Sequence, residues 1–205
     1  MSKDTRETII ETAIELFNKK GYDAVSLRDI AKEAGTTIGN LTYHFHHKAD
    51  LLATIEHQIE LDFVEFADNS SKTGEAALNE LVKIFKKSAE LKHRNEFFFK
   101  DFDAIVSDNP TLRVSTQLFR KRLYEAYQQC FTRMVKFEVF RQDITTPQYD
   151  HLIMVLLTMD YAWELRHGPK NTFDFPADSA QMNLSLIYPY LTENGRRIYK
   201  RIVQN

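Results

Sequence analysis

The sequence predicts an all-α fold. Only six of its 205 residues are glycine, alternating strand patterns are scarce, and apolar residues recur at helical spacing from one end to the other. Hydrophobic residues make up 43% of the chain, which is ordinary for a protein that buries a core. We expect a short N-terminal helical domain followed by a larger helical bundle.

The first helix is expected from about Thr5 to Lys20, and Gly21 should stop it because glycine tolerates the backbone that ends a helix. Its apolar residues share one face, and they are Ile9, Ala13, Leu16 and Phe17.

Two short helices are expected next. Ser26 can cap the first of them, with Asp29 three residues later as the capping-box partner, and Gly35 ends it after about two turns. Thr36 or Thr37 can cap the second almost at once. Two short helices joined by a glycine turn form a helix-turn-helix, whose second helix enters the DNA major groove.

This second short helix has one apolar and one polar side. Ile38, Leu41 and Phe45 are spaced to face a small core. The opposite side is polar and aromatic, with Thr36, Asn40, Tyr43, His44 and His47. Gly39 costs a helix about 1 kcal/mol relative to alanine, which indicates that a DNA phosphate or base edge approaches the backbone there.

The rest of the chain is expected to form longer helices. The helix after Lys48 should turn five apolar residues inward, namely Leu52, Ile55, Ile59, Phe63 and Phe66, and end at the linker-like stretch 68–74. Further helices are expected at about 75–92, at about 95–107, from Pro110 after an Asn109 cap, from Thr146–Pro147 to about 166, and from about 178 with a break at Pro189.

Composition limits the class of protein. The net charge of -2 argues mildly against nucleic acid but permits a small DNA-binding surface, because charge can be segregated, as in the basic stretch NGRRIYKRIVQN. No apolar run approaches the roughly 20 residues that span a bilayer, and the charged start MSKDTRETII lacks a signal peptide, so a cytoplasmic location is expected. Cys130, the only cysteine, is expected to be a buried thiol.

Two stretches of the first 50 residues, LFNKKGYDAVSLRDIAKEAG and GNLTYHFHHKADLL, resemble in order and spacing the DNA-binding domain of the TetR family of bacterial transcriptional regulators. The resemblance implies a helix-turn-helix domain over residues 1–47, a helical ligand-binding and dimerisation domain over 48–205, and a homodimer that binds operator DNA. The family form has a tyrosine three residues after the glycine. This chain has Thr42 there and Tyr43 next, so either could make the phosphate contact usually made by that tyrosine.

The candidate DNA-binding residues are Arg28, Thr36, Thr37, Gly39, Asn40, Thr42, Tyr43, His44 and Lys48. The Asn40 amide can pair with adenine N6 and N7, and Thr37, Tyr43 and His44 can meet bases or phosphates. Arg28 and Lys48 would contact phosphates and set the register. Thr37 could instead be only a helix cap, and Tyr43 could instead pack on the domain surface.

Aromatic residues of the middle helices could line a small-molecule cavity or could form solid core. The family resemblance favours a cavity for an unknown effector, lined by Phe98, Phe102, Tyr124, Tyr127, Phe131, Met154 and Trp163. Asp160 lies among apolar neighbours, where it could pair across a dimer interface or recognise a cationic ligand group.

The helix at about 147–167 and the region from Asp178 are expected to pack against a second copy in an isologous four-helix contact. The reason is that this helix is apolar over more than one stripe, with Leu152, Val155, Leu156, Met159 and Trp163.

Two functions remain from the residues. The first is a homodimeric transcription regulator, expected to be a repressor, that a small ligand releases from a palindromic operator. The alternative is a helical enzyme or metal-binding protein that uses His44, His46 and His47. Near these three histidines the sequence offers no cysteine or clustered carboxylate as a fourth metal ligand. The chain also has no GxSxG motif, no phosphate-cradling glycine loop and no Glu-x-x-His pair of the di-iron type. We therefore expect no enzyme, no metal and no cofactor.

Overall fold

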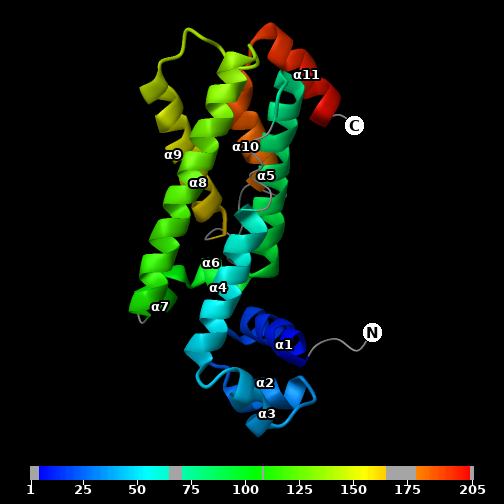
Figure 1. The fold of residues 1–205 in the computed structure, drawn as a ribbon, viewed down its shortest axis with the longest axis vertical. Coiled ribbons are helices and arrows are strands. Elements are labelled where there is room, and N and C mark those ends of the chain that lie inside the picture. Colours follow the sequence, from blue (N-terminus) through cyan, green and yellow to red (C-terminus); the bar gives the residue numbers. More distant parts are fainter. Residues whose placement is uncertain (1–4, 65–70, 108, 165–178, 204–205) are drawn as a thin grey trace, which may run out of the picture. The chain divides into compact units, whose positions relative to one another are not determined.

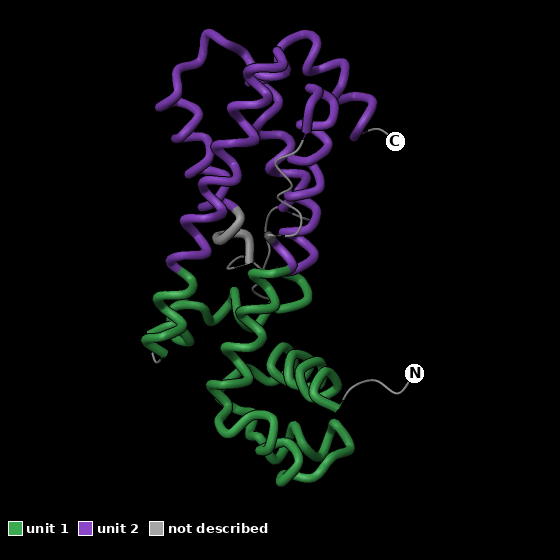
Figure 2. Tube along the Cα trace, viewed as in Figure 1, with its two compact units in different colours: residues 1–61, 92–116 green, residues 62–91, 117–205 purple. Residues whose placement is uncertain are grey.

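The computed structural model describes residues 5–64, 71–107, 109–164 and 179–203, apart from the side chains of residues 64 and 160–164 (Figure 1). Within these ranges every named element is helical. The chain forms two compact units, one of residues 1–61 and 92–116 and the other of residues 62–91 and 117–205 (Figure 2). The all-α prediction is confirmed.

The first unit begins with three helices and most of a fourth. They are α1 (Thr5–Lys20), α2 (Leu27–Glu33), α3 (Ile38–His44) and α4 (Lys48–Val64). The bounds of α1 are those predicted, and Gly21 follows it with a φ of 83° that favours glycine. The inward side chains of these helices are buried, among them Ile9, Ala13, Phe17, Ile30, Leu41 and Ile55.

Side-chain caps set the starts of α2 and α3, as predicted. The Asp29 amide donates to Ser26 Oγ over 3.2 Å, and the Ser26 amide donates to Asp29 Oδ2 over 2.9 Å, which completes a capping box. The side-chain and backbone hydrogen bonds from Ser26 lower the pKa of Asp29. The Asn40 amide donates to Thr37 Oγ1 over 3.1 Å, so Thr37 caps α3.

The prediction for Ile38 was wrong. Leu41 and Phe45 are buried at 0% and 2% exposure, but Ile38 is 42% exposed. A helix turns about 100° per residue, so Ile38 lies about 60° from Leu41 and only about 20° from Phe45 around the axis, and rotation does not explain its exposure. The reason is its position along the helix, because Ile38 is the first residue of α3 and lies beyond the end of the small core.

The helix expected over 95–107 is two helices, α6 (Glu96–Lys100) and α7 (Phe102–Ser107), which follow α5 (Gly74–Arg94). Asp101 separates them with φ and ψ of −105° and 22°, outside the helical region. Phe98 and Phe102, on either side of this break, are both buried and meet edge to face at 5.7 Å.

Asn18 joins α1 to the start of α6 within the first unit. Its Nδ2 donates to the Arg94 carbonyl over 2.8 Å, and its Oδ1 accepts from the Phe97 amide over 2.9 Å. Asn95, at the N-cap of α6, makes no side-chain capping bond, so Asn18 supplies one from a distant part of the chain. The neighbouring Phe17 ring packs 5.0 Å from the Phe97 ring.

The second unit contains most of α5 and α8 (Pro110–Lys136), then α9 (Thr146–Glu164), α10 (Ser179–Ile187), the 3-10 helix η1 (Tyr188–Tyr190) and α11 (Glu193–Val203). The predicted break at Pro189 is confirmed, since η1 holds that residue. Cys130 is fully buried, as predicted, and burial raises the pKa of its thiol to about 12. The core of this unit includes Leu78, Leu81, Phe85, Tyr127, Phe131, Met134, Phe140 and Leu156.

The starts of α8 and α5 differ in detail from the prediction. At the start of α8 the Asn109 backbone carbonyl accepts from the Arg113 amide over 3.1 Å, while its side-chain Nδ2 donates back to the Ile105 carbonyl over 2.7 Å. Pro110 therefore starts α8 at a position where its missing N–H is not needed. Phe66 lies outside the described residues, and α5 begins at Gly74, at the end of the expected linker.

Gly195 in α11 is a point of close approach. A Cβ atom there would lie 2.2 Å from the Val139 carbonyl oxygen, which is backbone and cannot rotate away. Gly195→Ala is expected to lower the free energy of unfolding by about 1–3 kcal/mol, measured by urea denaturation. Asn194→Ala, at an exposed neighbouring position of the same helix, is the control and should change it by less than about 0.5 kcal/mol. Equal effects in the two variants would contradict this account.

Candidate nucleic-acid interface

The turn between α2 and α3 is held by backbone hydrogen bonds. Gly35 has a φ of 65°, and the Thr36 amide donates to the Ala31 carbonyl over 2.9 Å. This is the bonding of a Schellman motif, which ends α2 and starts a new direction one residue later. The cap at Thr37 follows directly, so the orientation of α3 depends on Gly35 and Thr37 together.

The outward side of α3 is exposed. Thr37, Gly39, Asn40 and Tyr43 are exposed, while Thr36, Thr42 and His44 are partly buried. Added carbon at Gly39 would meet only Thr37 Oγ1 at 3.9 Å, so the fold itself does not require glycine there. A glycine at this position leaves the helix backbone open to close approach from outside.

The amide of Asn40 is held in place on this side of α3. Its Nδ2 donates to Thr36 Oγ1 over 2.9 Å. An amide has two N–H donors and one carbonyl acceptor, so among the described residues one donor and the oxygen remain available. These are the two groups that a bidentate contact with adenine uses.

Thr42 and Tyr43 differ in what their hydroxyls can do. Thr42 Oγ1 lies 2.9 Å from the Ile38 carbonyl and 3.1 Å from the Gly39 carbonyl, so its single proton is donated within the helix. Tyr43 is 79% exposed, and its ring meets the His44 ring edge-on at 5.3 Å. The geometry therefore favours Tyr43 over Thr42 as the residue with a hydroxyl to offer a partner.

Lys48 lies at the start of α4 and has contacts that the sequence did not indicate. Its Nζ donates to the Tyr22 carbonyl over 2.8 Å and to the Val25 carbonyl over 3.1 Å, and it lies 4.0 Å from the centre of the Tyr22 ring. Burial lowers the pKa of Lys48. The ammonium group thus ties α4 to the loop between α1 and α2.

Lys48→Met is expected to lower the free energy of unfolding by about 1–2 kcal/mol, because two charge-assisted hydrogen bonds are lost at a partly exposed site. Urea denaturation measures this loss, with the exposed Lys32→Met as control. The same variant tests the predicted phosphate contact in a separate measurement. If Lys48 contacts a phosphate, the slope of the logarithm of the DNA-binding constant against the logarithm of salt concentration should be smaller in Lys48→Met by about one. Unchanged stability would contradict the structural role.

His44, His46 and His47 have different surroundings. His44 lies at the end of α3, whereas His46 and His47 are exposed beyond it, and the His47 amide donates to Asp50 Oδ2 over 2.8 Å at the start of α4. In the part of the chain that the structure describes, no three His, Cys, Asp or Glu side chains are placed to hold a metal ion.

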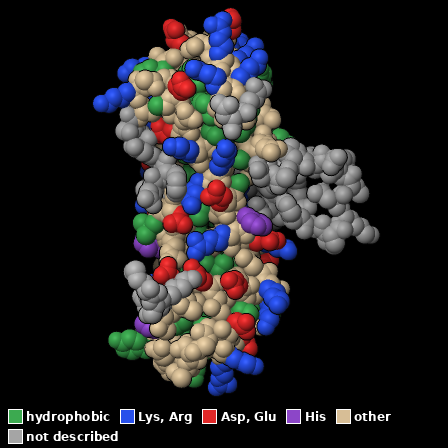
Figure 3. Space-filling view, turned by 90° about the vertical axis from the view of Figure 1, so that its right-hand side faces the viewer, with side chains coloured by type: hydrophobic (Ala, Val, Ile, Leu, Met, Phe, Trp, Pro, Cys, Tyr) green, Lys and Arg blue, Asp and Glu red, His purple; other side chains and the backbone are tan. Residues whose placement is uncertain are grey.

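Arg28, a predicted phosphate contact, is exposed on α2. On the face seen in Figure 3, acidic and basic side chains are interspersed.

The predicted effector residues lie in different parts of the chain. Phe98 and Phe102 belong to the first unit, while Tyr124, Tyr127, Phe131 and Met154 belong to the second. Tyr127 and Phe131 are buried at 1% and 2% exposure with their rings 6.4 Å apart, whereas Met154 is 53% exposed. The Trp163 side chain lies outside the described residues, as does that of Asp160. The cavity remains a prediction.

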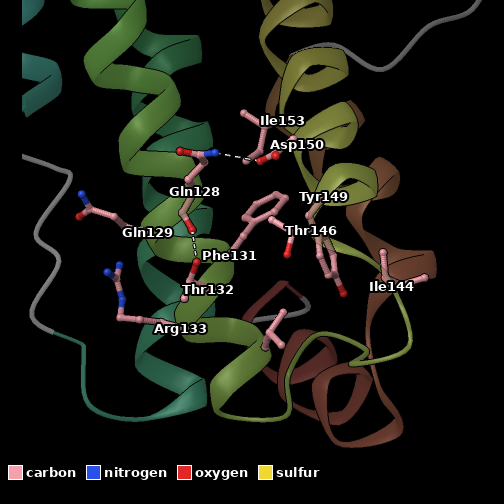
Figure 4. Close-up of a pocket in the computed structure, with 11 residues that line it drawn as sticks. Gln128, Gln129, Phe131, Thr132, Arg133, Ile144, Thr146, Tyr149, Asp150 and Ile153 are labelled. Atoms are coloured by element: carbon pink, nitrogen blue, oxygen red, sulfur yellow. Dashed lines mark hydrogen bonds between the residues drawn. The ribbon is translucent and has the colours of Figure 1, made fainter.

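A groove of ≈ 690 Å³ lies between α8 and α9 in the second unit (Figure 4). Of the predicted effector residues whose side chains the structure describes, only Phe131 lines it. Gln128 Nε2 bridges the two helices by donating to Asp150 Oδ1 over 2.9 Å, and Gln129 and Arg133 point away from α9. This polar bridge was missed because the two residues are 22 positions apart and share no local pattern.

Comparison with known proteins identifies two matching family models. The model of "Bacterial regulatory proteins, tetR family" matches residues 9–55, and that of the TetR "Bacterial transcriptional repressor" matches residues 62–199. Among the helices that the structure describes, none has the length and apolar character of a membrane span.

Among curated relatives, the chain is 37% identical over 81 residues to the probable HTH-type transcriptional regulator YttP of Bacillus subtilis (strain 168), covering 40% of this chain and 36% of that protein. It is 26% identical over 174 residues to the HTH-type transcriptional regulator SAUSA300_2515 of Staphylococcus aureus (strain USA300), covering 81% and 85%. The alignments with the first three curated relatives span only 36%, 49% and 25% of their lengths.

Solved structures share the fold over nearly the whole chain. A TetR-family transcriptional regulator from Marinobacter aquaeolei VT8 has a TM-score of 0.81 at 21% identity and covers 98% of both chains. A gamma-butyrolactone receptor, described as ArpA-like, has a TM-score of 0.65 at 20% identity and covers 100% of this chain and 97% of its own. With the family models matching both parts of the sequence, the chain belongs to the TetR family of bacterial regulatory proteins.

Proposed function

We propose that this protein is a homodimeric transcriptional repressor that binds a palindromic operator in the cytoplasm and leaves it when a small molecule binds. The observation that carries the proposal is the outward side of α3. It is exposed, it is held by caps at both ends of the α2–α3 turn, and it presents Gly39, Asn40 and Tyr43 together. A helix of this kind fits the major groove.

The charge of the N-terminal region makes specific contacts important. Residues 1–50 contain seven Lys and Arg and eight Asp and Glu, so this region has no net positive charge with neutral histidines. Non-specific attraction to phosphates should therefore be weak. Binding would depend on base contacts from Asn40 and phosphate contacts from residues such as Arg28 and Tyr43.

A small-molecule effector is supported by the fold that the chain shares with the gamma-butyrolactone receptor. Its class is open, because likeness of fold does not determine the ligand. The aromatic residues of the second unit, including Tyr124 and Phe131, are the proposed lining.

The experiment that tests the proposal uses the purified full chain and sheared DNA from its own genome. Retained fragments, once sequenced, should share a palindromic site, with two half-sites as expected of a two-fold symmetric dimer. Gly35→Val, which strains the turn before α3, should retain far fewer fragments. Retained fragments that share no site in the parent protein would sink the proposal.

The dimer is expected to use the exposed part of α9. Of the predicted contact residues, Leu152 and Leu156 are buried in the core of the same chain, Met159 is partly buried, and the Trp163 side chain lies outside the described residues. Val155, at 45% exposure, is open to a partner. Met154 beside it is 53% exposed. We expect light scattering to show a dimer at micromolar concentration, and Met154→Glu with Val155→Glu to show a monomer. Asn194→Glu, exposed on α11, should remain dimeric; a monomeric parent would contradict the proposal.

A further inference from the structure

Ile38 is an exposed apolar side chain on the helix that carries the polar candidates. Ile38 is the first residue of α3, and 42% of its surface is exposed although its side chain is entirely apolar. Within residues 5–61 the other large exposed hydrophobic side chains are Tyr43 and Leu61, so two of the three lie on α3. The fold leaves Ile38 outside the small core at the first residue of α3, and the proposed roles of the polar residues do not use it.

The position of Ile38 on the helix is distinct from that of Asn40. At about 100° per residue, Ile38 and Asn40 lie about 160° apart around the axis of α3, on opposite flanks of Gly39. The Ile38 carbonyl accepts the Thr42 hydroxyl, which holds the first turn in a closed helical form. Because Gly39 has no side chain, a DNA groove could come close enough to reach both flanks.

The chemistry of the groove identifies the partner. In the major groove of DNA, the apolar group that marks one base is the C5-methyl of thymine. A β-branched side chain is stiff about χ1, so it can present a methyl surface with little loss of freedom on binding. We propose that Ile38 contacts the C5-methyl of one thymine in each operator half-site and is therefore a specificity-determining residue. This inference rests on the proposed function.

The test removes the methyl group from the DNA and the side chain from the protein in turn. The probe is a duplex of the shortest genomic fragment that the full chain retains, with each thymine of a half-site replaced singly by deoxyuridine. Deoxyuridine keeps the hydrogen-bonding edge of thymine and lacks only the methyl. For the parent protein, one replacement should weaken binding about fourfold, which corresponds to one buried methyl group.

Ile38→Ala should bind the unmodified duplex more weakly and should lose its response to that one replacement. Ile38→Val, which keeps the branched carbon, should retain the response. Asn40→Ala is the matched control on the other flank, and it should bind more weakly but keep the parent's response to deoxyuridine. Thermal unfolding of each variant should match the parent, since Ile38 and Asn40 are both exposed.

The outcomes separate this inference from the proposed function. If the chain retains no operator, the proposed function fails and this inference fails with it. If it binds an operator and no thymine replacement weakens binding, or if Ile38→Ala responds to every replacement as the parent does, only the role of Ile38 is overturned.

Discussion

Phe17→Ala is expected to lower the free energy of unfolding of the first compact unit by about 3–5 kcal/mol, the range for deleting a buried phenyl ring. Phe17 is 0% exposed, and its ring lies 5.2 Å from the Tyr22 ring and 5.0 Å from the Phe97 ring. The substitution would leave a cavity between α1, the loop that follows it, and α6. Because Asn18 bonds to the same junction, its contacts should weaken as well.

Urea denaturation followed by far-ultraviolet circular dichroism measures this loss. Phe99→Ala is the matched control, because it removes the same ring from α6 at a partly exposed position. A control loss as large as that of Phe17→Ala would show that the Phe17 contacts have no special weight. The Phe17 variant should also bind DNA poorly, since α3 packs on α1 in the native unit.

Asn40→Ala is expected to weaken operator binding by about 1–3 kcal/mol and to relax the preference at one base pair. The amide is exposed, and Thr36 Oγ1 holds it by one N–H, which leaves its other donor and its oxygen for a base edge. The measurement is a titration of protein with operator and with a set of single-base variants at fixed salt concentration.

Thr36→Val separates contact from orientation. It removes the hydroxyl that holds the Asn40 amide and keeps the amide itself, so its effect on affinity should be smaller and the base preference should persist. If Asn40→Ala bound operator and random DNA as the parent does, the base-reading role would be wrong.

The caps and stops of the first three helices were predictable because they are local. Ser26 and Asp29 are three residues apart, as are Thr37 and Asn40, and the geometry of a first helical turn brings such pairs together wherever the helix lies. Gly21 and Gly35 both have positive φ, which is the reason that glycine ends a helix well.

Periodicity was less reliable in short helices. It placed Leu41 and Phe45 correctly and Ile38 wrongly, because seven residues make barely two turns and the end of the helix extends past the core. It also joined α6 to α7, since Phe98 and Phe102 keep helical spacing across the break at Asp101. The predicted boundary between residues 47 and 48 stays a prediction, and the first compact unit adds residues 92–116, in which α6 packs on α1 and α7 packs on α6.

The sequence by itself determined the helical class, the helix-turn-helix and the set of polar residues on α3, because each of these depends on the spacing of residues close together in the chain. Only the tertiary structure decided that Lys48 bonds to the Tyr22 and Val25 carbonyls, that Asn18 caps α6 from 79 positions away, and that Ile38 is exposed. Contacts over such distances in the chain depend on how helices pack, and a local pattern of residue types contains no information on which distant atoms will meet.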